Sequence, residues 1–291
     1  MAKYQRQLGD IRIHRIVEST ETPLGFQTMF PETGPEDRGR HQDWMTPWAM
    51  DPSSGNLTIV FQAFLLQTSH HNILVDACVG DNKPRQDNPS WHLQQRGTFL
   101  PLLAQAGVAP EAVDYVMCTH MHSDHVGWNT ELRDGRWAPT FPNAEYVFSR
   151  KELAAWEDLH RKTPQPHLTD SVFPILEAGQ ARLVDNDFAI DDEVWFESTP
   201  GHTPDHVSVR MASRGARGTV TGDLIHSPVQ CLEPYWLMFA DFEPERAKAT
   251  RHAFLDAHCD TDILVCATHF PEPSFGHIVR RHDAFWFEYE E

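Results

Sequence analysis

Residues 119–127 read Thr119-His120-Met121-His122-Ser123-Asp124-His125-Val126-Gly127, and four of them are potential metal ligands within six positions. The four are His120, His122, Asp124 and His125. They directly follow the apolar run 114–119, which predicts a buried strand. A strand end holds the backbone in place, while the loop after it can turn several side chains toward one point. The stretch therefore predicts a metal site formed by imidazole and carboxylate groups.

The rest of the chain predicts strands and helices without an intervening linker. Apolar or alternating runs predict strands at 11–17, 57–66, 73–76, 145–148, 181–184, 194–198, 206–211, 218–221 and 262–266. Helical patterns occur near 100–104, from a capping box at Ser149 and Glu152 through Leu159, and over 241–259. No repeat or shift in composition marks a boundary, so we expect one α/β domain over residues 1–291.

Two segments interrupt this pattern, at residues 20–56 and 80–96. The first is rich in proline and glycine but also contains large apolar residues such as Phe30 and Trp44. It is too irregular for regular elements and too aromatic for a solvated linker. We therefore expect a folded excursion at 20–56 that could serve as a lid.

Composition excludes several classes of protein. The chain has 42 acidic residues against 24 lysines and arginines, and its net charge of −18 opposes binding to nucleic acid. No apolar run approaches the ~20 residues that span a bilayer, and Met1–Gln7 lacks the apolar run of a signal peptide. We therefore expect a cytoplasmic protein without a membrane partner. The five cysteines form no CxxC pair, so we expect small buried side chains rather than a disulfide framework.

The motif at 120–125 resembles the HxHxDH signature of the metallo-β-lactamase superfamily and matches it without a gap. The resemblance continues through Thr199–His206, Thr221–Asp223 and Ala267–Pro271, each of which follows a predicted strand. It implies the fold of that family, a four-layer αββα sandwich of two mixed β-sheets.

The resemblance also implies a ligand set for two metal ions. In the family, the residues that match His120, His122 and His202 bind one ion. The residues that match Asp124, His125 and His269 bind the other ion. Asp223 lies at the position that bridges both ions. Nitrogen and oxygen ligands without thiolate suit zinc, our default expectation, and also manganese, iron, cobalt or nickel.

Four further residues carry expectations. Asp124 and His226 are the predicted catalytic residues, because His226 lies where lactonases of this superfamily often place a tyrosine that touches the substrate. It could donate to a substrate oxygen, orient a metal ligand, or be structural. Asp76 resembles an aspartate of the family that supports the loop at 120–125, which we call the metal loop. The alternative is that Asp76 only caps the end of its strand. Asp205 stands where the family often has glycine, and we expect a solvated turn carboxylate.

The expected chemistry is hydrolysis. Two divalent ions can lower the pKa of a shared water and so supply a bridging hydroxide that cleaves a small, fairly apolar ester or lactone. Segments 222–230 and 269–278 resemble the branch of methyl parathion hydrolase and related lactonases. Phosphotriester (organophosphate) hydrolysis and hydrolytic dehalogenation are alternatives on the same site. A catalytically silent metal-binding scaffold is the alternative from another class.

The expected partner is a small-molecule substrate, and a homodimer remains open. The aromatic run 234–239 predicts a substrate wall shared with residues from 20–56.

Overall fold

The structure is a computed structural model that describes residues 4–290. Residues 1–3, which belong to the Met1–Gln7 stretch considered above, and residue 291 lie outside this range, so the single domain expected over 1–291 is described without its outermost residues.

Two mixed β-sheets form the centre of the molecule. The first has seven strands in the order β1 (Gln5–Leu8), β2 (Ile11–Gly25), β3 (Asn56–Gln67), β4 (Asn72–Val75), β5 (Tyr115–Met117), β8 (Glu145–Ser149) and β9 (Ala181–Val184). The second has six, in the order β10 (Val194–Ser198), β11 (Val207–Ser213), β12 (Ala216–Val220), β13 (Leu264–Cys266), β14 (Phe275–Arg281) and β15 (Ala284–Tyr289). Neighbours from β4 to β9 are parallel, as are β12 and β13, and the other pairs are antiparallel. A separate hairpin joins β6 (Thr130–Arg133) to β7 (Arg136–Pro139).

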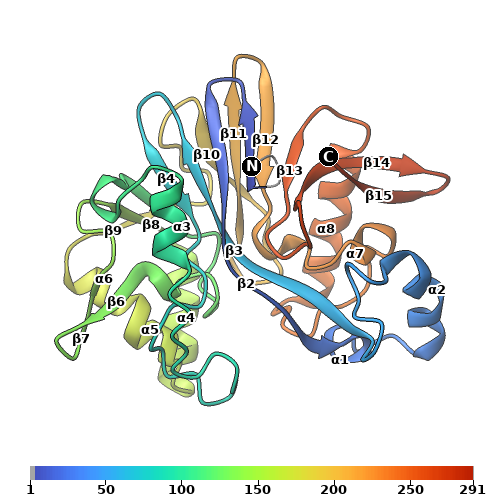
Figure 1. Ribbon diagram of the computed structural model, residues 1–291, viewed down its shortest axis with the longest axis horizontal. Coiled ribbons are helices and arrows are strands. Elements are labelled where there is room, and N and C mark those ends of the chain that lie inside the picture. Colours follow the sequence, from blue (N-terminus) through green and yellow to red (C-terminus); the bar gives the residue numbers. More distant parts are fainter. Residues whose placement is uncertain (1–3, 291) are drawn as a thin grey trace.

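Helices cover the outer faces of both sheets (Figure 1). On one side lie α3 (Phe99–Gln105), α4 (Arg150–Lys162), α5 (Pro166–Ser171) and α6 (Phe173–Glu177), and on the other α7 (Val229–Leu232) and α8 (Pro244–His258). Short α1 (Phe26–Met29) and α2 (Pro35–Met45), and the 3-10 helices η2 (Pro110–Ala112), η3 (Gly127–Asn129) and η4 (Gly222–Leu224), complete the elements. This is the four-layer αββα arrangement expected from the sequence.

Strand β3 shows why the layers hold together. Its side chains alternate between two apolar clusters, because successive residues of a strand point to opposite faces. Ala63 and Leu65 pack toward the helices α3 to α6, whereas Phe64 and Leu66 pack between the sheets. A strand that is buried on both faces reads as a nearly continuous apolar run, and residues 59–66 of β3 do so with Gln62 as the one polar residue.

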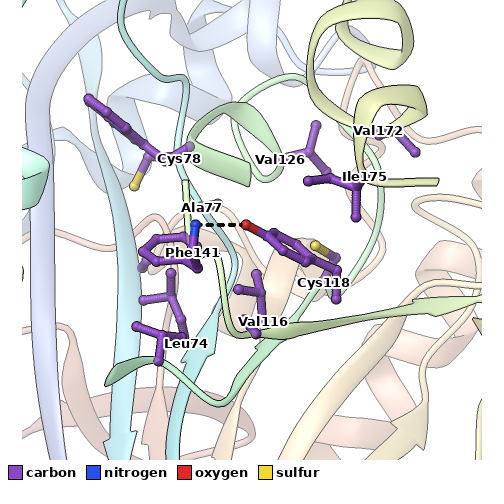
Figure 2. Close-up of a cluster of buried hydrophobic side chains, with 14 of the residues drawn as sticks. Leu74, Ala77, Cys78, Val116, Cys118, Val126, Phe141, Val172 and Ile175 are labelled. Atoms are coloured by element: carbon purple, nitrogen blue, oxygen red, sulfur yellow. Dashed lines mark hydrogen bonds between the residues drawn. The ribbon is translucent and has the colours of Figure 1, made fainter. Parts of the chain in front are cut away.

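An apolar cluster supports the loop that carries residues 120–125 (Figure 2). Cys118 precedes this loop and Val126 follows it, and both side chains are buried in the cluster. Leu74 and Val116 come from the parallel strands β4 and β5. Packing therefore fixes both ends of the loop.

The segment 20–56 corrects our expectation. It is not irregular, because β2 continues to Gly25 and helices α1 and α2 follow. Proline is compatible with the first turn of a helix, and Pro35 starts α2 there, where Asp37 accepts a hydrogen bond of 2.8 Å from the amide of Gly34. The proline and glycine residues thus begin and separate short elements.

Other boundaries agree more closely. Ser149 Oγ accepts from the Glu152 amide at 3.3 Å, which is one half of the expected capping box. The helix expected at 241–259 begins at Pro244. The hairpin of β14 and β15 was not expected, although Phe275, Phe285 and Phe287 are buried in it.

Buried side chains include four of the cysteines, as expected: Cys78, Cys118, Cys231 and Cys266. Within residues 4–290 no helix combines the length and the apolar character needed to cross a membrane.

A buried lysine anchors the segment 80–96 to the helical layer. Lys83 is fully buried, and its Nζ donates to Thr130 Oγ1 at 2.6 Å and lies 3.9 Å from Asp170 Oδ1. Arg85 binds the same carboxylate through two hydrogen bonds of 2.6 and 2.9 Å. Burial lowers the pKa of Lys83 to about 7, although Asp170 opposes the shift.

This lysine predicts a pH dependence of stability. Between about pH 7 and pH 10.5 the unfolded chain binds a proton on Lys83 that the folded chain releases. The contribution of Lys83 to the free energy of unfolding therefore rises with pH in this range. The slope can reach about 1.4 kcal/mol per pH unit. Urea unfolding of the protein and of Lys83→Met across this window measures the effect as a difference in the free energy of unfolding. Parallel pH profiles would show that Lys83 keeps its proton.

Candidate metal centre

Four loops that follow strands of the two sheets form the centre. The loop after β5 carries residues 120–125, and the loop after β10 carries His202. Asp223 lies in η4 directly after β12, and His269 lies just after β13. The sheets hold the strand ends in fixed positions, and their loops therefore supply side chains that converge.

All seven predicted ligands come together, in two sets. One set is His120, His122, His202 and Asp223, and the other is Asp124, His125 and His269. Within each set the candidate ligand atoms lie within 4.8 Å of one another. His122 and Asp124 are partly exposed, and the other five residues are buried.

Asp223 lies between the two sets. Its Oδ2 is 3.2 Å from His202 Nε2 and 3.6 Å from His120 Nε2. Its Oδ1 is 3.0 Å from His125 Nε2 and 2.9 Å from His269 Nε2. Each oxygen of one carboxylate therefore faces a different set, which is the geometry that a bridging ligand requires.

Partners outside the centre orient four of the imidazoles. The Nδ1 atoms contact oxygens at 3.0 Å for His120 (Thr119 Oγ1), 2.9 Å for His125 (Asp76 Oδ2), 3.0 Å for His202 (Asp241 Oδ1) and 2.9 Å for His269 (Val60 carbonyl). An imidazole that donates from Nδ1 carries a lone pair on Nε2 when it is neutral. These contacts therefore direct the Nε2 lone pairs into the centre.

The atoms inside the centre fit divalent metal ions. The Nε2 atoms of His120 and His202 each lie 2.9 Å from Nδ1 of His122, and one proton on His122 cannot satisfy both. The buried atoms His125 Nε2 and Asp223 Oδ1 lie 3.0 Å apart, but neither atom makes a hydrogen bond of acceptable geometry with the described residues. These imidazole nitrogens and carboxylate oxygens could all donate lone pairs to a cation, so the donor set suits zinc and similar metals.

Burial and neighbouring charges set the protonation states. Burial and the surrounding imidazoles lower the pKa of His120 and of His122 well below the usual value, which keeps both rings neutral. Burial alone would raise the pKa of Asp223, but the imidazoles, His125 first, hold it well below its usual range. Burial is the largest single influence on His125 and His269 and lowers their pKa, but Asp223 and the neighbouring carboxylates together outweigh it and raise the pKa of both rings. Asp223 is therefore the anionic centre of the site.

Asp76 and Asp205 have different roles from one another. Asp76 is buried and accepts hydrogen bonds from Thr119 N at 2.8 Å and from His125 Nδ1 at 2.9 Å, so it supports the metal loop. Asp205 is also buried, which corrects the expectation of a solvated turn carboxylate. Its carboxylate binds Ser149 and Asn186 rather than the ligands, because the turn packs against the start of α4.

The backbone of Asp223 depends on a close approach at Gly222. The φ angle of Gly222 is +55°, and a Cβ there would lie 2.7 Å from His206 Nε2 and 2.8 Å from Thr119 Oγ1. His206 Nε2 accepts a 3.0 Å hydrogen bond from the Asp223 amide. We expected His206 to be a structural residue beside Asp205, and this contact shows that it positions the backbone of the bridging candidate.

His226 lies beside Asp223. Its Nε2 is 3.2 Å from Asp223 Oδ2, and its ring stacks on His269 with centroids 5.7 Å apart. Burial lowers the pKa of His226 to about 4, although Asp223 opposes the shift, so the ring is neutral at pH 7. It also lines the cavity above the centre. Its catalytic role stays a prediction.

A cavity of about 370 Å³ opens onto both sets of residues. Its apolar walls include Leu24, Met29, Ile59, Phe61, Trp91, Met238 and Phe239. The expected wall at 234–239 thus contributes only through its end, because Trp236 packs against Phe26 and Phe30 and Tyr235 stacks on His252.

Several contributing residues escaped the sequence analysis. Ile59 and Phe61 read as ordinary strand residues, and Trp91 lies in a segment with no periodic pattern. Asp241, the partner of His202, lies at the edge of a predicted helix and gave no chemical signal. Only their position in the fold brings them to the centre.

Comparison with curated proteins finds relatives that are N-acyl homoserine lactonases. An N-acyl homoserine lactonase of Bacillus cereus is 25% identical over 184 residues, which are 60% of this chain and 64% of that protein. One from Bacillus thuringiensis is 24% identical over 201 residues, 66% of this chain and 73% of that protein. The alignment with the first thus spans less than two thirds of that relative.

Solved structures share the fold. The hydrolase AbOPH of the beta lactamase superfamily has a TM-score of 0.83 at 23% identity, over 99% of this chain and 97% of that one. AidC, a dizinc quorum-quenching lactonase solved with an N-acyl-L-homoserine product, has a TM-score of 0.81 at 20% identity, with the same coverage.

The family profile described as "Metallo-beta-lactamase superfamily" matches residues 62–269. That range holds both sets of converging residues and the strands that position them. Because the profile matches well over half of the sequence, the chain belongs to the metallo-β-lactamase superfamily.

Proposed function

We propose that this protein is a dinuclear metal-dependent hydrolase of small, fairly apolar lactones or esters, with N-acyl homoserine lactones as its first substrate class. The position of Asp223 carries the proposal, because its two oxygens face two separate sets of ligand-type residues. The apolar cavity next to these sets supports a substrate with an alkyl or acyl chain. The curated relatives named as N-acyl homoserine lactonases support the choice of lactone.

The two sets of residues would each hold one divalent ion. His120, His122 and His202 would hold one ion, Asp124, His125 and His269 the other, and Asp223 would contact both. Two bound divalent ions supply an activated water and polarise the scissile carbonyl. Zinc is the first choice on the donor set, with manganese, iron, cobalt or nickel as alternatives.

The chain itself contributes orientation and charge. Asp223 places a negative charge where cations must lie, and its neighbours keep it ionised. The walls of the cavity remove the substrate chain from water, which gives binding energy in proportion to the apolar area buried. Neutral His226 lines the cavity, and we propose that it donates a hydrogen bond to the charge that develops on a substrate oxygen.

A substrate comparison tests the proposed class. We expect the metal-loaded enzyme to hydrolyse N-acyl homoserine lactones with a higher kcat/KM than aryl esters, dialkyl aryl phosphotriesters or halogenated aromatics. The lactone combines a polar ring with an apolar chain that fits the cavity. A higher kcat/KM for the triester would assign the protein to organophosphate hydrolysis, and a metal-loaded protein inactive on every class would favour the silent scaffold.

Metal content tests the centre. We expect about two divalent ions per chain and loss of activity after chelation. Asp223→Ala should lower affinity for metal by more than the ~10–100-fold typical of removing a residue that only supports a ligand. Asp205→Ala is the matched control, because this buried carboxylate contacts none of the seven residues. Elemental analysis and kcat measured on both variants decide the matter, and equal effects would place the bridge elsewhere.

His226 has its own test. We expect His226→Ala to lower kcat by roughly 10²–10³-fold, the range found when one donor to a developing oxyanion is lost, with both ions retained. Recovery of the rate by added metal would instead show that His226 orients Asp223, 3.2 Å away. A rate within about threefold of the parent, with both ions present, would leave it a structural residue.

A further inference from the structure

The carboxylate of Asp241 is a buried junction between a predicted metal ligand and the wall of the cavity. Its side chain is 0% exposed. Oδ1 accepts from His202 Nδ1 at 3.0 Å, and Oδ2 accepts from the Met238 amide at 3.1 Å. Met238 lines the cavity, so one carboxylate contacts both parts of the site.

Arg251 of α8 compensates the charge of Asp241 and holds the same segment. Its guanidinium is buried and lies 3.3 Å from Asp241 Oδ2. It also donates to the carbonyls of Leu224, Pro234 and Trp236 at 2.9, 2.9 and 3.0 Å. Leu224 directly follows Asp223, so Arg251 ties the wall segment to the loop of the bridging candidate.

The backbone on both sides of Asp241 completes the link. The Asp241 amide donates to the Met238 carbonyl at 3.0 Å, which closes a tight turn. The amide of the next residue, Phe242, donates to the carbonyl of His202 at 3.0 Å. The imidazole and the main chain of His202 are thus both held by the same short segment.

We propose that Asp241 is a positioning residue that orients His202 and increases its basicity as a ligand. The inference rests on the proposed dinuclear centre. A carboxylate partner fixes the tautomer of a ligand imidazole and strengthens its donor nitrogen. In the same set, Nδ1 of His120 contacts the hydroxyl of Thr119. Among the described residues, Asp241 is the one carboxylate that contacts an imidazole nitrogen of this set that points away from the centre. Loss of Asp241 therefore lowers the affinity for the ion that His120, His122 and His202 would hold, and it leaves the affinity for the other ion unchanged.

Asp241→Asn is a nearly isosteric test. Both oxygens of Asp241 accept hydrogen bonds, and an amide has only one acceptor oxygen. If that oxygen faces His202, the amide NH₂ group meets the donors of Met238 and Arg251. If the NH₂ group faces His202 instead, it disfavours the Nδ1-protonated ring that metal binding needs.

The experiment titrates Zn²⁺ into metal-free protein against a competing chromophoric chelator and counts bound ions by elemental analysis. We expect Asp241→Asn to weaken one of two binding steps by roughly 10–100-fold and the other by less than about threefold. The weakened step should be the one lost in His202→Ala and retained in His125→Ala. Excess Zn²⁺ should restore most of kcat in Asp241→Asn, which a purely structural defect would not allow.

Asp205→Asn is the matched control, because it neutralises an equally buried aspartate that contacts Ser149 and Asn186 instead. It should bind both ions like the parent. Asp241→Glu keeps the charge that Arg251 needs and serves as the second variant if the asparagine protein does not fold. It should weaken the same binding step, because one added methylene displaces the carboxylate from His202.

Three results would overturn the inference. The Asp241 variants could bind both ions like the parent, weaken both steps equally, or lose the step that belongs to His125. If the parent binds two ions and the Asp241 variants bind them with the same affinities, the positioning role is refuted and the proposed function stays intact. A parent that binds no ion would refute both proposals.

Discussion

The arrangement depends on one buried carboxylate surrounded by imidazoles. Asp223 is almost completely buried, and its oxygens lie within 3.6 Å of ring nitrogens from His120, His125, His202 and His269. An isolated buried carboxylate is costly, so these neighbours are required to keep it charged. The imidazoles come from loops after both sheets, and the two sheets must therefore pack together before the centre exists.

The need to satisfy polar groups extends this constraint outward. Each oriented imidazole uses one nitrogen inside the centre and the other on a fixed oxygen, from Thr119, Asp76, Asp241 or the Val60 carbonyl. Val60, Asp76 and Thr119 lie in or just after strands β3, β4 and β5 of the first sheet, whereas Asp241 lies in the segment before α8. The ligand geometry thus depends on residues that are distant in the sequence, since buried polar groups need partners.

The cavity follows the same principle. Its walls come from β3, the start of the segment 20–56, the segment 80–96 and the segment before α8. Buried basic side chains tie two of these segments to the helices: Lys83 and Arg85 of the segment 80–96 contact Asp170 of α5, and Arg251 of α8 binds Asp241. Such buried polar contacts hold a loop in one conformation, which suits a surface that must select a substrate.

The sequence by itself determined the strand-borne metal motif, because its four ligand-type residues lie close together after an apolar run. The seven converging residues and the αββα class came from the resemblance of this motif and of three later segments to the metallo-β-lactamase superfamily. The sequence did not reveal α1 and α2, in a segment that looked irregular, or the buried state of Asp205. It also left unseen the partners of the ligands, such as Asp241, and the cavity wall of Ile59, Phe61 and Trp91. Only tertiary structure decided these features, because contacts between residues far apart in the chain leave no periodic or spacing signal along it.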